Sequence, residues 1–239
     1  LAPFLSGEVL IFDMRLERPE VTVTIDEDGM LDWAVRPNTQ IDPHSISVES
    51  LSVTEGRVVV RNLAGGREHV LAGIEADLNA RTLAGPWRAV GTMSVDGVAT
   101  AMTITTGTAE PGAPLRLRLR AEPVDYPLTV ELEGHAAVSE EGGLGYEGQF
   151  RIAAHALMAG EQAQGVPAHR ISGSFSLDHQ AIRSEELRLE TGPVDDPYTA
   201  EGSAMVSLGA EPRFRIVAEG VQFRVTVRTS TMWGAAGLG

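Results

Sequence analysis

The chain has 239 residues, 43% of them hydrophobic and 22% charged, a composition that indicates a folded protein and excludes a disordered one. Its 19 basic and 33 acidic residues give a net charge of −14, which argues against nucleic acid and against electrostatic attachment to anionic lipid. The absence of cysteine excludes a disulfide, a thiol nucleophile and a zinc–thiolate site.

Segments in which apolar and polar residues alternate follow one another through almost the whole chain. Because successive side chains of an extended chain point to opposite faces, this alternation predicts strands with one apolar face. The predicted strands are 7–16, 21–25, 30–35, 46–53, 57–61, 70–80, 87–95, 98–104, 115–120, 128–133, 146–154, 171–177, 186–191, 198–208 and 213–227. Their close spacing is typical of an all-β protein, and no long helical stripe is present.

Turn signals separate these segments. Asp28-Gly29 and Asp96-Gly97 predict hairpin turns, since glycine accepts the positive φ that such turns require. Glu55-Gly56 predicts a further turn, between 46–53 and 57–61. The loop-like stretch 108–114 predicts a boundary within the chain. The predicted organisation is a first β-groove section, 1–113, a second, 114–227, and a frayed tail, 228–239.

The clearest pattern is a predicted hairpin in which leucines alternate with arginines on one strand, 115–120. Apolar residues alternate with threonine and glutamate on the next strand, 128–133. One face is therefore apolar and the other charged. Over the whole chain, the candidate residues of the apolar face are Leu78, Met93, Met102, Leu115, Leu117, Leu119, Leu128, Val130, Leu132, Phe150, Ile152 and Phe175.

Small residues are frequent at the apolar positions, and aromatic residues make up only 5% of the chain. Protein interiors pack to the density of organic crystals. A single curled sheet with alanine and glycine inside would leave a channel that acyl chains could fill. The alternative is that the apolar face is the dry core of a β-sandwich.

No motif predicts catalysis, a metal site or a cofactor. The segment 143–148 matches GxGxxG, but the residues after it alternate as a strand, whereas a dinucleotide site requires a helix there. The acidic segment 26–29 resembles the start of a calcium loop but lacks the closing glutamate. The six histidines share no metal-ligand spacing, and no nucleophile elbow or P-loop occurs. The prediction is a protein that is not an enzyme.

Three segments, Arg15 to Trp33, Ile46 to Gly97 and Glu185 to Ile216, resemble the AsmA-like family of bacterial envelope proteins. The first has a strand, the pair Arg18-Pro19, a β-branched strand, a glycine turn and an aromatic residue. The resemblance implies an elongated sheet curled into a taco-like groove, tethered to the inner membrane of a Gram-negative bacterium by an N-terminal helix and extending into the periplasm. We interpret the chain as a piece of a longer protein whose anchor helix lies upstream.

The fold expected is therefore all-β: a predominantly antiparallel, elongated sheet curled into a groove with an apolar interior and little helix. The function implied by the resemblance is to bind and conduct phospholipid between the two membranes, or to support outer-membrane assembly. The expected partners are phospholipid acyl chains, the rest of the longer chain and outer-membrane assembly proteins, with no nucleic acid and no membrane contact except through the anchor. The alternative is a non-catalytic structural or ligand-binding β-sandwich or solenoid module of the cell envelope.

Overall fold

The computed structural model describes residues 9–28, 30–33, 43–63, 65–138, 143–154, 169–192, 196–208, 211, 213–220 and 224–229. Most of them lie in strands, and the one helical element among them is a single 3₁₀ turn, Pro43–Ser45. The strands are β1 (Val9–Ile11), β2 (Met14–Glu17), β3 (Glu20–Ile25), β4 (Leu31–Trp33), β5 (Ile46–Asn62), β6 (Arg67–Ala80), β7 (Trp87–Val95), β8 (Val98–Thr106), β9 (Leu115–Pro123), β10 (Leu128–Val138), β11 (Leu144–Ala154), β12 (His169–Leu177), β13 (Ala181–Thr191), β14 (Tyr198–Ser207), β15 (Phe214–Gly220) and β16 (Arg224–Thr229).

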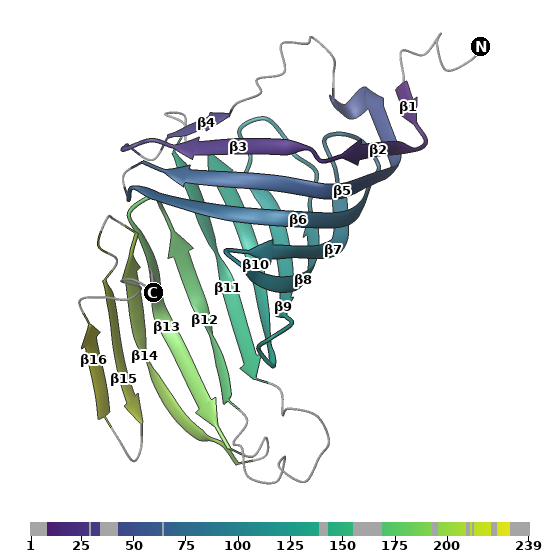
Figure 1. Ribbon diagram of the computed structural model, residues 1–239. Helices are drawn as coiled ribbons and strands as arrows, with labels where there is room; N and C mark the ends of the chain where they lie inside the picture. The colour runs from purple at the N-terminus through teal and green to yellow at the C-terminus, as the bar shows by residue number, and fades with distance from the viewer. Residues whose placement is uncertain are drawn as a thin grey trace, which may run out of the picture.

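All of these strands belong to one sheet (Figure 1). From β5 to β16 each strand pairs with the next in antiparallel fashion, in the order of the chain. Beyond β5, the strands β1, β2 and β3 lie end to end along its free edge and run parallel to it, and β4 pairs with β3. The order of paired strands therefore ends at β4 on one side and at β16 on the other, and the sheet does not close into a barrel. The all-β, predominantly antiparallel fold predicted from the alternation is confirmed.

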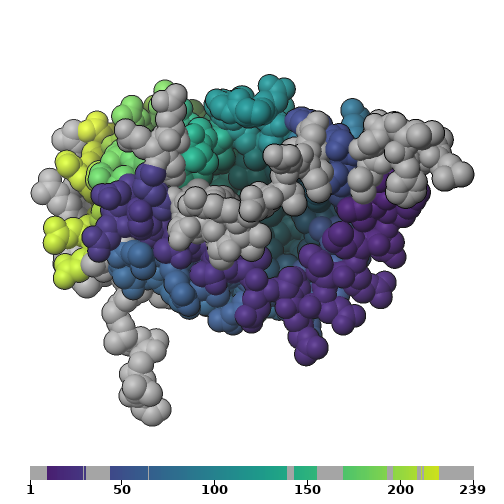
Figure 2. Space-filling view, turned by 90° about the horizontal axis from the view of Figure 1, so that it is seen from above, coloured from purple at the N-terminus to yellow at the C-terminus, as the bar shows by residue number. Residues whose placement is uncertain are grey.

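The sheet is strongly twisted and curled. In Figure 1, β5 and β6 run across the view, whereas β12 to β14 run down it, which reflects the right-handed twist that accumulates from strand to strand. The curl brings Met30, beside β4, to an isolated β-bridge with Gly143, beside β11. From above, the surface is hollowed between the N-terminal strands, in purple and blue, and the teal strands behind them (Figure 2). The sheet is thus an open groove.

Glycines on the apolar face allow the sheet to bend towards that face. A Cβ added at Gly91, Gly134 or Gly202 would lie 2.1, 2.1 or 1.8 Å from a carbonyl oxygen of the neighbouring strand. In a flat sheet a Cβ stands away from the neighbouring backbone, so these short distances mean that adjacent strands converge on the apolar side. Glycine within a strand commonly marks such a bend. The apolar face is therefore the inner face of the curl.

No second layer seals this face among the described residues. Val48 and Tyr146 are buried, but most of the other buried hydrophobic residues are alanines, and no large side chain in the described part of the chain is completely buried. A sandwich core would bury its large side chains completely, at crystal-like packing density. The structure therefore corresponds to the curled groove and not to the closed β-sandwich.

Three details of the predicted strands are corrected by the structure. The turn predicted at Glu55-Gly56 is wrong: β5 continues through it for 17 residues. Glu55 has a φ of 53° and the register with β6 shifts around Gly56, so this pair forms a β-bulge. The predicted strand 7–16 is divided into β1 and β2, and the predicted strand 213–227 into β15 and β16.

The expected division of the chain falls within a continuous sheet, since β8 and β9 pair directly across the connection at 107–114. The hairpins predicted at Asp96-Gly97 and over 114–138 are confirmed. Of the tail 228–239, only Arg228 and Thr229, at the end of β16, are among the described residues.

Candidate functional site: the apolar inner face

Two adjacent rows of apolar residues cross the sheet at right angles to the strands. Each member of a row is the direct cross-strand partner of the next, from β5 to β15. The first row is Leu51, Leu78, Ala89, Ile104, Leu119, Leu132, Phe150, Gly173, Leu187, Gly202 and Ala218. The second row is Val53, Ala76, Gly91, Met102, Ala121, Val130, Ile152, Ile171, Leu189, Ala200 and Gly220.

The length of these rows exceeds that of a single acyl chain. With neighbouring strands about 4.8 Å apart, a row that passes from β5 to β15 follows the sheet for roughly 48 Å. The hydrocarbon core of a whole bilayer, which two acyl chains span end to end, is about 30 Å thick. Neither row is interrupted by a charged or polar residue. The inner face therefore offers a continuous apolar path.

All twelve candidate residues predicted from the sequence lie on this face. Seven belong to the two rows: Leu78, Leu119, Leu132 and Phe150 to the first, and Met102, Val130 and Ile152 to the second. The other five flank the rows, and cross-strand pairing or two-residue spacing along a strand places them on the same side of the sheet. They are Met93, Leu115, Leu117, Leu128 and Phe175. Each of the twelve is half-buried.

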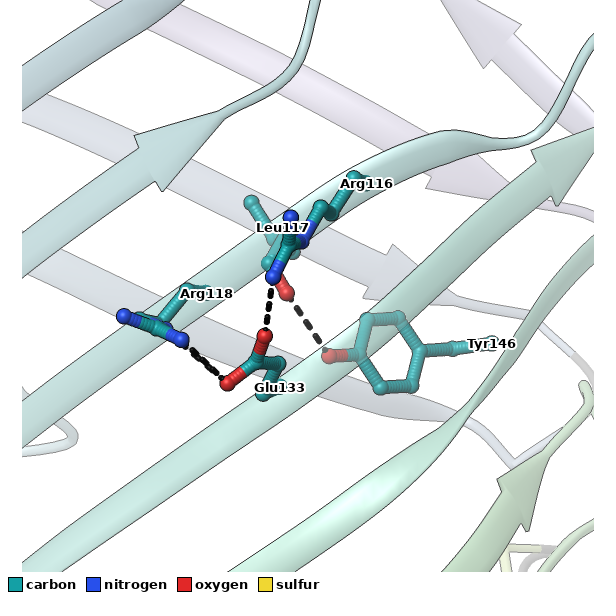
Figure 3. Close-up of polar contacts among 5 residues, drawn as sticks. All are labelled: Arg116, Leu117, Arg118, Glu133 and Tyr146. Atoms are coloured by element: carbon teal, nitrogen blue, oxygen red, sulfur yellow. Dashed lines mark hydrogen bonds and ion pairs between the residues drawn. The ribbon is translucent and has the colours of Figure 1, made fainter.

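An aromatic cluster lies on the inner face over β11 and β12. The rings of Tyr146 and Phe175 stack with their centroids 5.3 Å apart, and Phe150 meets Phe175 edge to face at 5.9 Å. The Tyr146 hydroxyl donates a hydrogen bond to the carbonyl oxygen of Leu117, 3.2 Å away on β9, two strands from its own (Figure 3). Burial, and then the negative charge of Glu133, raise the pKa of Tyr146. The cluster therefore connects β9, β11 and β12 on the inner face.

A buried hydroxyl group on the inner face lacks a partner. Ser184 precedes the irregularity in β13, and its side chain is 6% exposed. Its Oγ is buried and has no hydrogen-bond partner in the described ranges of the chain. A Cβ added at Gly173, on the neighbouring strand, would lie 3.1 Å from this oxygen. An unsatisfied hydroxyl destabilises the fold, so Ser184 is a weak point of the inner face.

The outer face of the sheet is covered by ion pairs. Glu133 on β10 accepts hydrogen bonds from Arg116 and Arg118 on β9, one carboxylate oxygen to each guanidinium (Figure 3). Arg116 first, and then Arg118, hold the pKa of the Glu133 carboxyl below its usual value. Exposed ion pairs contribute little stability. Their main effect is to keep the outer face wetted and unsuited to fatty chains.

No reaction centre is evident among the described residues. They contain no group of three or more His, Asp or Glu side chains that could hold a metal ion. His69 and Asp96 form an ion pair of 2.7 Å at the β7–β8 turn, but both side chains are about half exposed. Burial would raise the pKa of Asp96, but hydrogen bonds from His69 and from the backbone N–H of Val70 outweigh it and lower the pKa. The pair therefore holds the β7–β8 turn against β6.

Sequence reasoning missed two features of the site. It did not identify the unbroken rows, because cross-strand register depends on the bulges at Glu55-Gly56 and after Ser184. It did not identify the bond from Tyr146, which spans two strands. The glycines at apolar positions were the sequence signal that predicts the bends of the sheet towards its inner face.

No described helix is long and apolar enough to cross a membrane. Comparison of the chain with models of known protein families, with curated proteins and with solved structures found no match.

Proposed function

We propose that the chain is a section of a periplasmic, AsmA-like envelope protein whose groove binds phospholipid acyl chains and conducts them between the inner and outer membranes. On this proposal the longer protein is tethered to the inner membrane of a Gram-negative bacterium through an N-terminal helix, and it conducts lipid or supports outer-membrane assembly. One observation carries the proposal: the inner face has two unbroken apolar rows, and none of the described residues forms a second layer over them.

Acyl chains match this face energetically. Each methylene that is removed from water contributes about 0.8 kcal/mol, so a long acyl chain gains on the order of 10 kcal/mol before ordering costs. This attraction is not directional, and the rows contain no polar residue to hold a lipid at one point. A lipid could therefore slide along the rows while its polar head remains in water at the groove opening.

The alternative function assumes a closed β-sandwich, which requires a second layer of strands. The described residues form a single sheet. A structural role for the open sheet predicts that the purified chain carries no lipid. Native mass spectrometry after detergent-free purification separates the two functions. Co-purified phospholipid supports the groove, and a bare protein mass contradicts it.

Charged substitutions test the path itself. Val130→Asp and Leu117→Asp place a carboxylate on the inner face, and Ala137→Asp places one on the outer face of β10 as the control. We expect the two inner variants to lose bound lipid and lipid transfer between vesicles, and the control to retain both. Single Leu→Ala changes in the groove should have little effect. Circular dichroism must show an intact sheet in each variant, and equal lipid transport by all three aspartate variants would refute the proposal.

A further inference from the structure

A further concave region, formed by described residues, lies on the outer, polar face. The twist makes the sheet saddle-shaped, so this face is also hollowed along one direction. The hollow has a volume of about 810 Å³ and extends from β7 to β13. A smaller hollow of about 270 Å³ adjoins it and shares Thr105 and Arg118. The polar side chains that line the larger hollow are Arg88, Thr103, Thr105, Arg118, Arg120, Glu131, Glu133, Gln149, Arg151, Ser172, Ser174 and Glu186.

The charge of this hollow is opposite in sign to that of the chain. Four arginines face three glutamates in the larger hollow, and Arg116 adds a further positive charge from the smaller one. The chain as a whole carries −14. Because a protein of this net charge repels anions over most of its surface, a cationic hollow concentrates anionic ligands locally.

Two of the arginines have no counter-ion among the residues that the structure describes. Arg118 donates a hydrogen bond to Glu133, and Arg120 donates one of 2.8 Å to Glu131. Arg88 and Arg151 make no ion pair or side-chain hydrogen bond within the part of the chain that the structure describes. Glu131 lies directly opposite Arg151 in the register, yet its carboxylate pairs with Arg120 instead.

The register places an arginine on each side of a threonine hydroxyl. Arg88 on β7, Thr105 on β8 and Arg118 on β9 are direct cross-strand partners. With strands about 4.8 Å apart, the two arginine backbones lie roughly 10 Å from each other, a span that two long side chains can close around one tetrahedral anion. Guanidinium groups bind phosphate oxygens in a bidentate manner, and a hydroxyl can donate to a third oxygen.

We infer that this hollow binds the phosphate group of a soluble, phosphate-bearing molecule, held by Arg88, Thr105 and Arg118. The volume, with its serine, threonine and glutamine side chains, accommodates the polar remainder of such a molecule. A lipid whose acyl chains lie in the groove cannot supply the phosphate, because the backbone of the sheet separates the two faces. The site therefore acts independently of lipid passage.

Calorimetric titration of the intact chain with pyrophosphate, at low salt, tests the inference. The variant Arg88→Gln removes an uncompensated charge from the hollow. Arg215→Gln is the matched control, since Arg215 is also exposed, lies on the polar face and has no partner among the described residues. We expect Arg88→Gln to weaken binding by about tenfold, as for loss of a charge-assisted hydrogen bond. The control should bind as the unchanged chain does, and binding should weaken as salt is added.

Three results would overturn the inference: no binding of pyrophosphate by the unchanged chain, equal weakening by both variants, or unaltered binding by Arg88→Gln. A parallel titration with phosphatidic acid vesicles distinguishes the source of the phosphate. Vesicle binding that is lost in Arg88→Gln, without binding of pyrophosphate, would assign the site to a lipid headgroup and overturn the soluble ligand. Val130→Asp should bind pyrophosphate normally, so failure of this site and failure of the groove are separable.

Discussion

A methyl group added at Gly134 tests whether the sheet bends towards its apolar face. In Gly134→Ala the new Cβ would lie 2.1 Å from the carbonyl oxygen of Glu147 and 2.6 Å from the Cα of Gly148. Ordinary contacts of this kind are 3.4 Å or longer. Both close atoms belong to the backbone of the neighbouring strand, so no side-chain rotation relieves the clash. β10 and β11 must separate.

The expected loss of stability follows from two terms. Overpacking costs about 1 to 3 kcal/mol, and separation of the strands weakens at least one ladder hydrogen bond, worth about 1 kcal/mol. The sum is about 3 kcal/mol, which for a chain of this size lowers the Tm by about 6 to 12 °C. The Tyr146 ring reaches Leu117 past this position, so near-ultraviolet circular dichroism of the aromatic cluster should change as well.

Gly145→Ala is the control within the same hairpin. The nearest atom to its added Cβ is the carbonyl oxygen of Leu177, 3.9 Å away, and its φ is not in the left-handed region. We expect this variant to match the unchanged chain or to gain up to about 1 kcal/mol, because alanine restricts the unfolded chain. Thermal unfolding followed by circular dichroism compares the two. Equal Tm values for both variants would refute the converging strands and with them the inward bend.

Three further outcomes are expected. Ser184→Ala should leave stability unchanged or raise it by about 1 kcal/mol, because it removes a buried hydroxyl without a partner; a lower urea midpoint would contradict this. Tyr146→Phe should lower stability by about 1 kcal/mol, since the Leu117 carbonyl loses its side-chain donor; an unchanged midpoint would show that the bond has no net value. The folded-state pKa of Asp96 lies below 3.8, its usual value. The ionised carboxylate therefore makes its full contribution to stability above that pH, and this contribution is lost as the pH falls through the folded-state pKa. Asp96→Asn should therefore be less stable than the unchanged chain near neutral pH, and the difference in unfolding free energy should shrink below about pH 4; a constant difference in acid would contradict the role of this carboxylate.

The alternation of residues was sufficient to predict the strands and their faces. In the segment 115–133, side chains two residues apart must share a face of an extended chain whatever lies around it. The local pattern therefore identified Leu117, Val130 and their companions as members of one surface. The Asp96-Gly97 turn was equally local, since both residues adopt the positive φ that the tight turn requires.

The pairing of the strands in the folded sheet determined which surfaces those faces form. Glu55-Gly56 has the composition of a turn, but β6 pairs with both sides of it and makes it a bulge. Each bulge shifts the register, so the alignment of apolar residues into rows depends on contacts between residues far apart in the chain. The same pairing places Arg88 two strands from Arg118, with Thr105 between them, and gives Arg88 no counter-ion among the described residues. Alternation along a strand is a property of neighbouring residues, whereas the continuity of a surface across strands depends on register, and only the folded sheet sets that register.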